Sequence, residues 1–123
     1  MDGLVAGRIV YFVFDAQSAD EVNRRRTTAN SIAELIGDLS WPRGAQAHIG
    51  NSVAAGDVLP AQVVRVWDKS SGSANLKVAL DGSDTYWATS VLYAEWSPEA
   101  ESVPTPRTWH WMYAGQATRG NTR

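Results

Sequence analysis

The chain has 123 residues, of which 44% are hydrophobic and 20% are charged, with a formal net charge of −2. This length fits a single domain that can bury enough surface to fold without a disulfide or a metal ion. The absence of cysteine excludes disulfides, thiolate metal sites and cysteine nucleophiles, and the negative net charge argues against bulk nucleic-acid binding through counterion release. We therefore expect one domain over residues 1–114 and a flexible polar tail over residues 115–123.

The first expected strand spans residues 7–14, a β-branched and aromatic segment without a polar break, so both of its faces should be covered. Its apolar run is too short to cross a bilayer, and no basic segment followed by an apolar one begins the chain. We therefore expect a soluble protein with no membrane interaction, located inside the cell that makes it.

A helical insertion is expected at about residues 16–41. Two segments match capping boxes, Ser18 to Glu21 and Ser31 to Glu34. An apolar stripe with helical spacing follows the second box and consists of Ile32, Leu35, Ile36 and Leu39. Weak helix formers at positions 27, 28 and 30 favour two short helices over one long helix, with the stripe packed over one end or face of the β-structure.

The remaining strands are expected at residues 60–67, 76–80, 85–93 and 108–113, separated by turn-forming segments. Alternation in the middle strands predicts two faces. The core face should hold Val64, Val66, Leu76, Val78 and Leu80. The opposite face should hold Arg65, Trp67 and Lys77, and it must be covered by the insertion, the last strand or a partner.

Five strands joined by short hairpins, with one long insertion, predict a mainly β (α+β) fold. The specific architecture that we expect is a small SH3-like five-stranded antiparallel barrel with the helical insertion between strands 1 and 2. The alternative is an open antiparallel sheet with one helix packed on it.

Several motifs form a recognisable set: Gly7-Arg-Ile-Val10, Trp41-Pro-x-Gly-Ala-Gln-Ala-His-Ile-Gly-Asn51, Pro60-Ala-x-Val-Val-Arg-Val-Trp67, Asn75-Leu-x-Val78, Trp87-Ala-Thr-Ser90 and Thr108-Trp-His-Trp111. Over residues 7–111 the chain resembles a group of small proteins encoded by tailed phages and prophages. The resemblance implies a phage gene product that acts in the bacterial host cytoplasm or in the virion, and it implies no activity. In that group proline usually follows the final Trp-His-Trp, whereas this chain has Met112.

The sequence contains none of the common catalytic or phosphate-binding motifs, so we expect no enzyme, no cofactor and no metal site. His110 should have a structural role at the end of the barrel, bonded to backbone. His48 lies in a loop, where functional residues are common, and is retained as a candidate binding residue. It is also the only candidate catalyst for the remaining hypothesis of a nucleotide hydrolase.

Consecutive arginines at positions 24–26 either form a solvated helix face or clamp an anion with one or two guanidinium groups. Arg43 and Arg65 would join such a site if the insertion folds back over the second strand. Six tryptophans are more than one small core is expected to hold, because each buried indole N–H needs a partner. Four of them, Trp67, Trp87, Trp109 and Trp111, should line either the core or a binding groove.

Together these features favour a non-enzymatic, self-associating binding protein. Its ligand would be a host protein or a small nucleotide-type molecule, as in a phage counter-defence protein that sequesters a signal. The expected binding residues are Arg24, Arg25, Arg43, His48, Arg65, Trp67, Trp87, Trp109 and Trp111. The alternative is a virion accessory protein, a head decoration or tail component, whose exposed aromatic residues form subunit interfaces.

Overall fold

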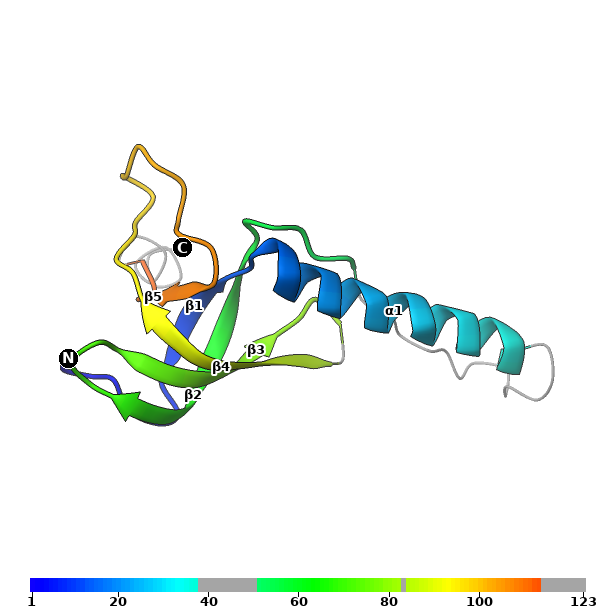
Figure 1. The fold of residues 1–123 in the computed structure, drawn as a ribbon, viewed down its shortest axis with the longest axis horizontal. Coiled ribbons are helices and arrows are strands. Elements are labelled where there is room, and N and C mark those ends of the chain that lie inside the picture. The colour runs from blue at the N-terminus through cyan, green and yellow to red at the C-terminus, as the bar shows by residue number, and fades with distance from the viewer. Residues whose placement is uncertain (38–50, 83, 114–123) are drawn as a thin grey trace, which may run out of the picture.

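A computed structural model describes residues 1–37, 51–82 and 84–113, with backbone only for residues 27–37. Figure 1 shows its six elements in chain order. They are β1 (Ile9–Val13), α1 (Ala16–Gly37), β2 (Val58–Asp68), β3 (Ser73–Ala79), β4 (Thr85–Tyr93) and β5 (Thr108–His110).

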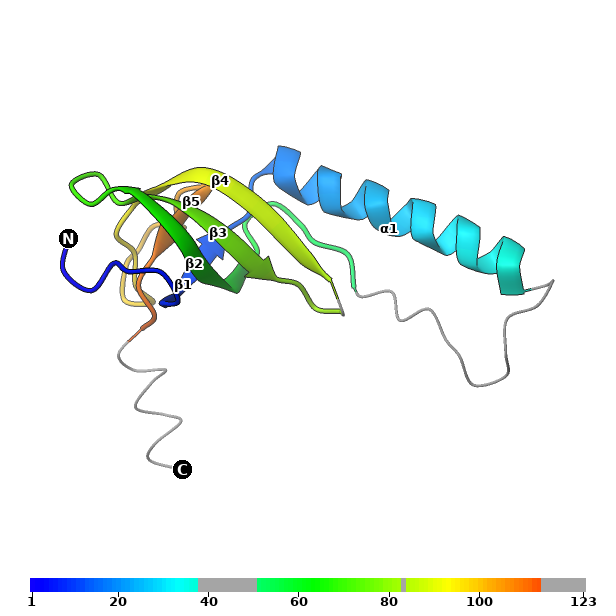
Figure 2. The same cartoon turned by 90° about the horizontal axis from the view of Figure 1, so that it is seen from below.

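The five strands form a closed barrel in the order β1-β2-β3-β4-β5. Successive strands from β1 to β4 pair antiparallel, β5 pairs antiparallel with β1, and β4 with β5 is the parallel pair that closes the barrel. Closure gives each of the five strands two neighbours, which satisfies backbone groups that an open sheet leaves at its edges. The small SH3-like barrel with a helical insertion between β1 and β2 is thus confirmed, and the open sheet is excluded (Figure 2).

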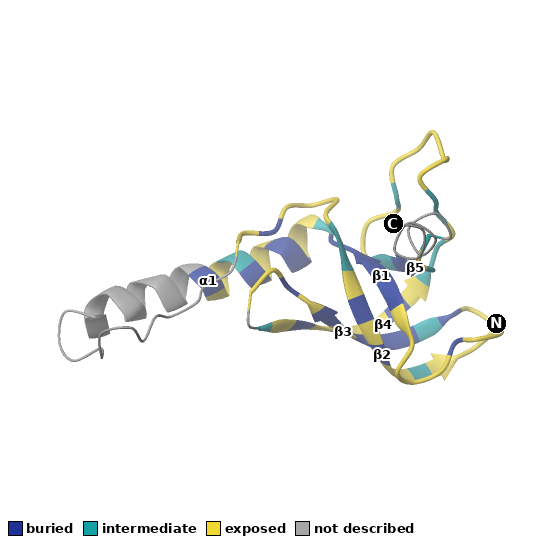
Figure 3. Cartoon of the chain, turned by 180° about the vertical axis from the view of Figure 1, so that it is seen from behind, coloured by how far each residue is buried: buried dark blue, intermediate teal, exposed yellow. Residues whose placement is uncertain are grey.

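The barrel interior is filled by side chains from all five strands. Its most buried members are Val10, Phe12, Val63, Leu76, Val78, Ala88, Val91 and Trp109, with Leu4 from the N-terminal segment. Four of the five residues of β1 are buried, which confirms that this strand is covered on both faces. Figure 3 shows buried residues along the strands of the barrel and on the first turns of α1.

Register shifts on β2 and β4 change which side chains face the core. On β2, Ala61 and Val63 are buried and Val64 is 43% exposed, so the predicted core position of Val64 is wrong because the core face of this strand is the one that holds Val63. The register shift between Val63 and Arg65 then reverses the alternation and packs Val66 against the core. On β4 a shift places Ala88 and Val91 on the same buried side.

Within the described residues the insertion forms one helix, α1, which runs through the predicted break between two helices, so that break is wrong. Its N-terminal cap is Asp15, whose Oδ1 accepts a bond from the Ser18 amide at 2.8 Å, while Ser18 Oγ accepts one from the Asp15 amide at 3.1 Å. The capping box therefore lies one turn before the predicted box at Ser18. The second predicted capping box, at Ser31, lies within α1, so no helix begins there.

The first half of α1, whose side chains the structure describes, is held against the barrel. Ala19 and Val22 are buried, and Asn23 exchanges two hydrogen bonds with the backbone of Val53, at 2.7 and 2.8 Å. The rest of the helix backbone extends past the barrel (Figures 1 and 2). The predicted apolar stripe at residues 32–39 falls on side chains outside the described residues.

A cluster of aromatic side chains, which we call the outer aromatic cluster, covers the outside of β1 and β5. Tyr11 and His110 are cross-strand partners, and their rings pack with Trp96 and Tyr113 at centroid distances of 4.7–5.7 Å. His110 is 1% exposed, and its Nδ1 has no hydrogen-bond partner among the described residues. Its Nε2 lies 3.5 Å from the Tyr113 hydroxyl, so within the described part of the chain this histidine contacts a side chain and the expected bond to backbone is not made. Its surroundings are aromatic, and burial lowers the pKa of His110 below its ordinary value of 6.5.

Gly72 provides a test of the tight turn between β2 and β3. Its φ is +74°, its carbonyl accepts the Trp109 Nε1–H bond at 2.6 Å, and an added Cβ would lie 2.7 Å from Tyr93 Cβ. We expect Gly72→Ala to lower the free energy of unfolding by at least about 2 kcal/mol, as measured by urea denaturation, because strain and overpacking add. Gly56→Ala is the matched control, since Gly56 has φ +93° and open space around it. Its cost should be the strain alone, about 1 kcal/mol, and equal losses for the two variants would contradict the close packing at Gly72.

The environment of His110 predicts a pH dependence of stability. Because the folded-state pKa lies below 6.5, the unfolded chain binds the proton more readily. The contribution to stability is therefore complete above the unfolded pKa and is lost as the pH falls from there to the folded-state pKa. Denaturation series between about pH 7.5 and 5.5 should show wild-type stability falling relative to His110→Phe. A constant difference between the two proteins across this range would contradict the prediction.

Candidate functional site

The outer surface of β2, β3 and β4 gathers aromatic and cationic side chains. Its members, which we call the outer sheet face, are Gln62, Arg65, Trp67, Asn75, Lys77 and Trp87. The register places Arg65 opposite Asn75, and it places Lys77 between Gln62 and Trp87. The face therefore spans three neighbouring strands with β3 in the middle.

Trp67 is held in place although half of it is exposed to solvent. Its Nε1–H donates to Asn75 Oδ1 at 2.9 Å, and the Arg65 guanidinium lies over its ring at 4.2 Å from the centroid. The ring remains 52% exposed. A hydrogen bond at the edge and a cation on one face fix the ring orientation, so Trp67 and Arg65 form a pre-ordered pair.

Asn75 is the polar centre of this face. Its Oδ1 accepts a second bond, from the Ser90 amide at 2.9 Å, and the residue is only 9% exposed. Ser90 has φ +51° and lies in the β4 bulge. One side-chain carbonyl oxygen on β3 therefore bonds both to the β4 bulge and to Trp67, which lies at the second register shift of β2.

Trp87 and Lys77 lie beside a shallow groove. Trp87 is 51% exposed and is the cross-strand partner of Lys77. Lys77 also borders an open groove of about 360 Å³ whose other lining residues are Ile9, Pro60, Ala61, Gln62, Ala79 and Thr85. The groove continues the outer sheet face toward β1 and offers apolar surface next to a cation.

The acidic groups at the two ends of this region are already engaged. Asp68 accepts bonds from the Ser70 amide at 2.9 Å and the Ser71 hydroxyl at 3.2 Å, and these bonds lower the pKa of its carboxyl group. At the other end Asp84 pairs with Arg25 and Arg26. Within the outer sheet face as defined, the two charged members, Arg65 and Lys77, are both cations, which favours an anionic ligand.

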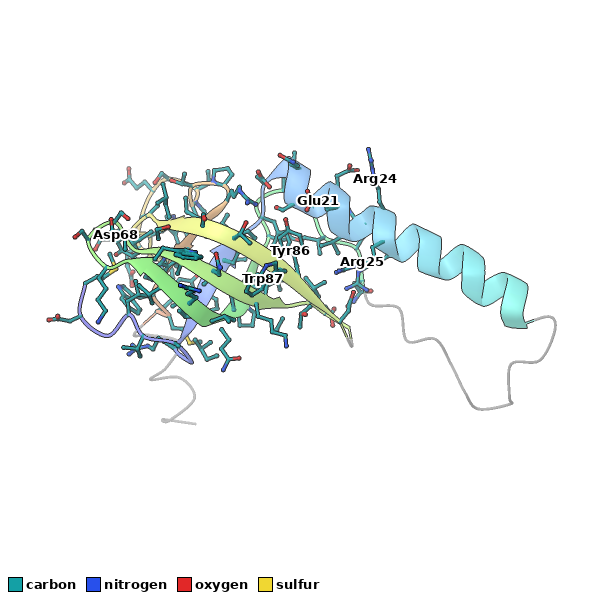
Figure 4. All side chains as sticks on the ribbon, turned by 60° about the horizontal axis from the view of Figure 1, so that its bottom comes forward. Glu21, Arg24, Arg25, Asp68, Tyr86 and Trp87 are labelled. Carbon is teal, nitrogen blue, oxygen red and sulfur yellow. The ribbon has the colours of Figure 1, made fainter. Side chains whose placement is uncertain are left out.

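The arginine cluster on α1 serves to attach the helix. Arg25 Nη2 lies 3.3 Å from the Asp84 carboxylate and donates to the Thr85 carbonyl at 3.0 Å, and Arg26, which is buried, bonds Asp84 at 3.0 Å. Figure 4 shows Arg25 pointing toward the β3–β4 connection and Arg24 pointing away from the barrel. Two arginines thus clamp a carboxylate of the protein itself, which differs from the predicted site for an external anion.

Tyr86 supplies a further link between α1 and the barrel. Its hydroxyl donates to Glu21 Oε2 at 2.8 Å, and Figure 4 shows the two residues facing each other. Burial and the Glu21 carboxylate raise the pKa of the Tyr86 hydroxyl. This contact helps to orient the helix on the barrel. The described part of α1 leaves the outer sheet face uncovered.

The other predicted site residues lie elsewhere. Trp109 is fully buried, and its placement on a binding surface is a wrong prediction, because its ring packs in the core and its N–H bonds Gly72. Trp111 contacts Trp109 edge-on at 4.9 Å and carries Arg8 over its ring at 5.0 Å, so the two pairs of tryptophans do not share one groove. Arg24 pairs with Asp20 at 2.8 Å in an exposed i, i+4 contact.

Arg43 and His48 lie outside the described residues. Sequence reasoning missed Asn75. Its role as a shared hydrogen-bond acceptor depends on register shifts in β2 and β4, which no residue pattern in the strands predicts. The alternation of hydrophobic residues predicted the pairing of Arg65 and Trp67 on one side, and the structure places them there only because the bulge precedes both.

Comparison with protein-family models, with curated proteins and with solved structures found no match. Within the described residues, no group of three or more histidine and carboxylate side chains is placed to hold a metal ion. The same part of the chain has no helix long and apolar enough to cross a membrane.

Asn75 is testable as a positioning residue. Asn75→Ala leaves the indole N–H of Trp67 and the Ser90 amide without their acceptor, so we expect a loss of about 1–3 kcal/mol in the free energy of unfolding. The fluorescence of the variant should also change as Trp67 becomes mobile. Asn75→Asp keeps an acceptor oxygen and should retain both properties better, whereas Lys77→Ala, on the same strand and face, should cost no more than about 0.5 kcal/mol. Equal effects of Asn75→Ala and Lys77→Ala would contradict this role.

Proposed function

We propose that this protein is a non-enzymatic binding protein whose outer sheet face holds a small nucleotide-type ligand. The observation that carries the proposal is the ordered set of Arg65 stacked on Trp67, with Lys77 and Trp87 beside it. A half-exposed indole ring can stack on the flat base of such a ligand. The two cations, which have no carboxylate among them on this face, can bind its phosphate.

The chemistry of each side chain supports this assignment. Stacking of a base on an aromatic side chain contributes about 1–3 kcal/mol, and Trp87 presents a half-exposed ring for it. Arg65 is already held in place by Trp67, so less side-chain entropy is lost when its guanidinium binds a phosphate in a bidentate contact. Lys77 supplies a second positive charge one strand away.

The proposed biological setting follows from the resemblance to proteins of tailed phages and prophages. In the host cytoplasm, a binding protein for a nucleotide-type signal would lower the free concentration of that signal and so counter a host defence. A host protein is the other ligand that we consider for the same face, because Trp and Arg also dominate protein interfaces.

A second candidate function rests on exposed apolar surface. Val64 and Trp67 on β2 and Trp87 on β4, two strands separated by β3, are each 43–52% exposed, which is the composition of a contact between subunits. In this alternative the protein is a virion accessory component that self-associates through the outer sheet face. Mass spectrometry of purified virions separates the two: stoichiometric recovery from particles supports the virion role and opposes the role in the host cytoplasm.

The nucleotide proposal is tested by isothermal titration calorimetry with a panel of nucleoside mono-, di- and triphosphates and cyclic dinucleotides. We expect at least one member to bind, and Trp87→Ala or Arg65→Ala to weaken it by about tenfold or more, since each removes about 1.4 kcal/mol or more of contact energy. Arg24→Ala is the matched control for lost charge, because Arg24 is exposed on α1 and pairs only with Asp20 among the described residues.

Affinity that is equal in wild type, Trp87→Ala and Arg65→Ala would contradict the proposed site, and the absence of binding by the whole panel would contradict the ligand class. In the second case, light scattering that detects a dimer or larger assembly lost in Trp67→Ala would favour the subunit interface.

A further inference from the structure

A pocket lies where β4 and β5 end side by side. The two strands run parallel, with Tyr93 paired to Trp109, so the segments that follow them leave the barrel together. Between these segments lies a pocket of about 380 Å³, within the range of small-ligand sites. Its lining residues are Tyr93, Glu95, Trp96, Ser97, Ala100, Trp111, Met112 and Tyr113. This pocket is independent of the outer sheet face.

Aromatic rings make up half of the lining, and each is fixed by contacts of its own. Trp96 donates its Nε1–H to the Ser102 carbonyl at 2.7 Å and meets Tyr113 edge-on at 5.7 Å. Tyr93 packs on Trp109 at 4.9 Å and on Trp111 at 6.4 Å. All four lining rings are only partly buried. The rings are thus held by neighbours while part of their surface stays open to a ligand.

The charge of the pocket selects the class of ligand. Among the described residues, Glu95 is the lining residue that is charged at neutral pH, and it lines the same pocket as Tyr93. Burial, and then the Glu95 carboxylate, raise the pKa of the Tyr93 hydroxyl. Trp111 already attracts one cation, Arg8, at 5.0 Å, and Arg8 does not line the pocket. Several aromatic faces with one carboxylate form the arrangement that binds alkylated ammonium groups, which need cation–π contact and few hydrogen bonds.

We propose that this pocket binds a methylated ammonium group, with Tyr93, Trp96, Trp111 and Tyr113 as its walls and Glu95 as the counter-charge. A methylated ammonium is preferred over a lysine ammonium, because it is weakly hydrated and its methyl groups can contact the four aromatic rings directly. The group is carried either by a small molecule of the choline type or by a trimethylated lysine in a peptide.

The test is an NMR titration of the full chain with choline, with its neutral isostere 3,3-dimethylbutan-1-ol, and with a short peptide that carries one trimethyllysine. We expect choline or the peptide to shift the Trp96 and Trp111 indole signals, with an affinity at least about tenfold higher than that of the neutral isostere. Tighter binding of the peptide identifies a protein ligand, and tighter binding of choline identifies a small molecule.

Two variants locate the site. Glu95→Gln, at an exposed position, should weaken binding by about threefold without affecting folding, and Trp96→Ala should abolish it. Trp87→Ala is the control, since it changes an exposed tryptophan on the outer sheet face and should leave choline binding unchanged. Equal affinity for choline and its neutral isostere, or no shift with either choline or the peptide, would overturn the proposal.

Discussion

The outer surface of the barrel depends on one carbonyl oxygen, Asn75 Oδ1. It accepts hydrogen bonds from the Trp67 indole and from the Ser90 amide, so the middle strand holds both of its neighbours. Because Asn75 is only 9% exposed, these two donors satisfy a side-chain oxygen that lies largely out of reach of solvent. These two bonds fix the positions of the irregular segments of β2 and β4 relative to β3. They also fix Trp67 at the surface that we propose to bind ligand.

The arginines on the helix and the arginine on the barrel surface have different roles. The arginines that stand out in the sequence are used for attachment: Arg25 and Arg26 hold the β3–β4 connection through Asp84. The arginine that points to function is Arg65, which stands alone in the sequence but stacks on Trp67 in the fold. Local clusters of charge are therefore poor guides here, because their partners come from distant parts of the chain.

Trp109 connects the two proposed sites to the core. It is fully buried, its N–H bonds the Gly72 carbonyl in the β2–β3 turn, and its ring packs against Tyr93 and Trp111 at the aromatic pocket. This one side chain thus fixes a turn next to the outer sheet face and two walls of the pocket. Its neighbour His110 points to the other side of β5 and packs with Trp96 in the outer aromatic cluster. Consecutive residues of β5 therefore pack on opposite sides of the strand.

Much of the fold follows from the sequence, because hydrophobic alternation and turn residues specify the five strands and their order. The bulges could not be predicted in this way, since a period of two has no place for the extra residue at Val64 or near Ser90. The helix cap was placed one turn late because Asp15 and Ser18 are both good capping residues, and only the hydrogen bonds distinguish them. The aromatic pocket was missed because it joins residues 93–100 to 111–113 through a parallel pairing that leaves no local pattern.

The central claim is that the outer sheet face is a ligand-binding surface organised around Asn75. The most direct measurement is a ¹H–¹⁵N NMR map of the tryptophan indole signals and β-strand amides during titration with a nucleotide that binds. The account predicts shifts at the Trp67 and Trp87 indoles and at amides of β2, β3 and β4, with the Trp109 indole unchanged. Shifts confined to Trp96 and Trp111, or spread without relation to these three strands, would contradict it.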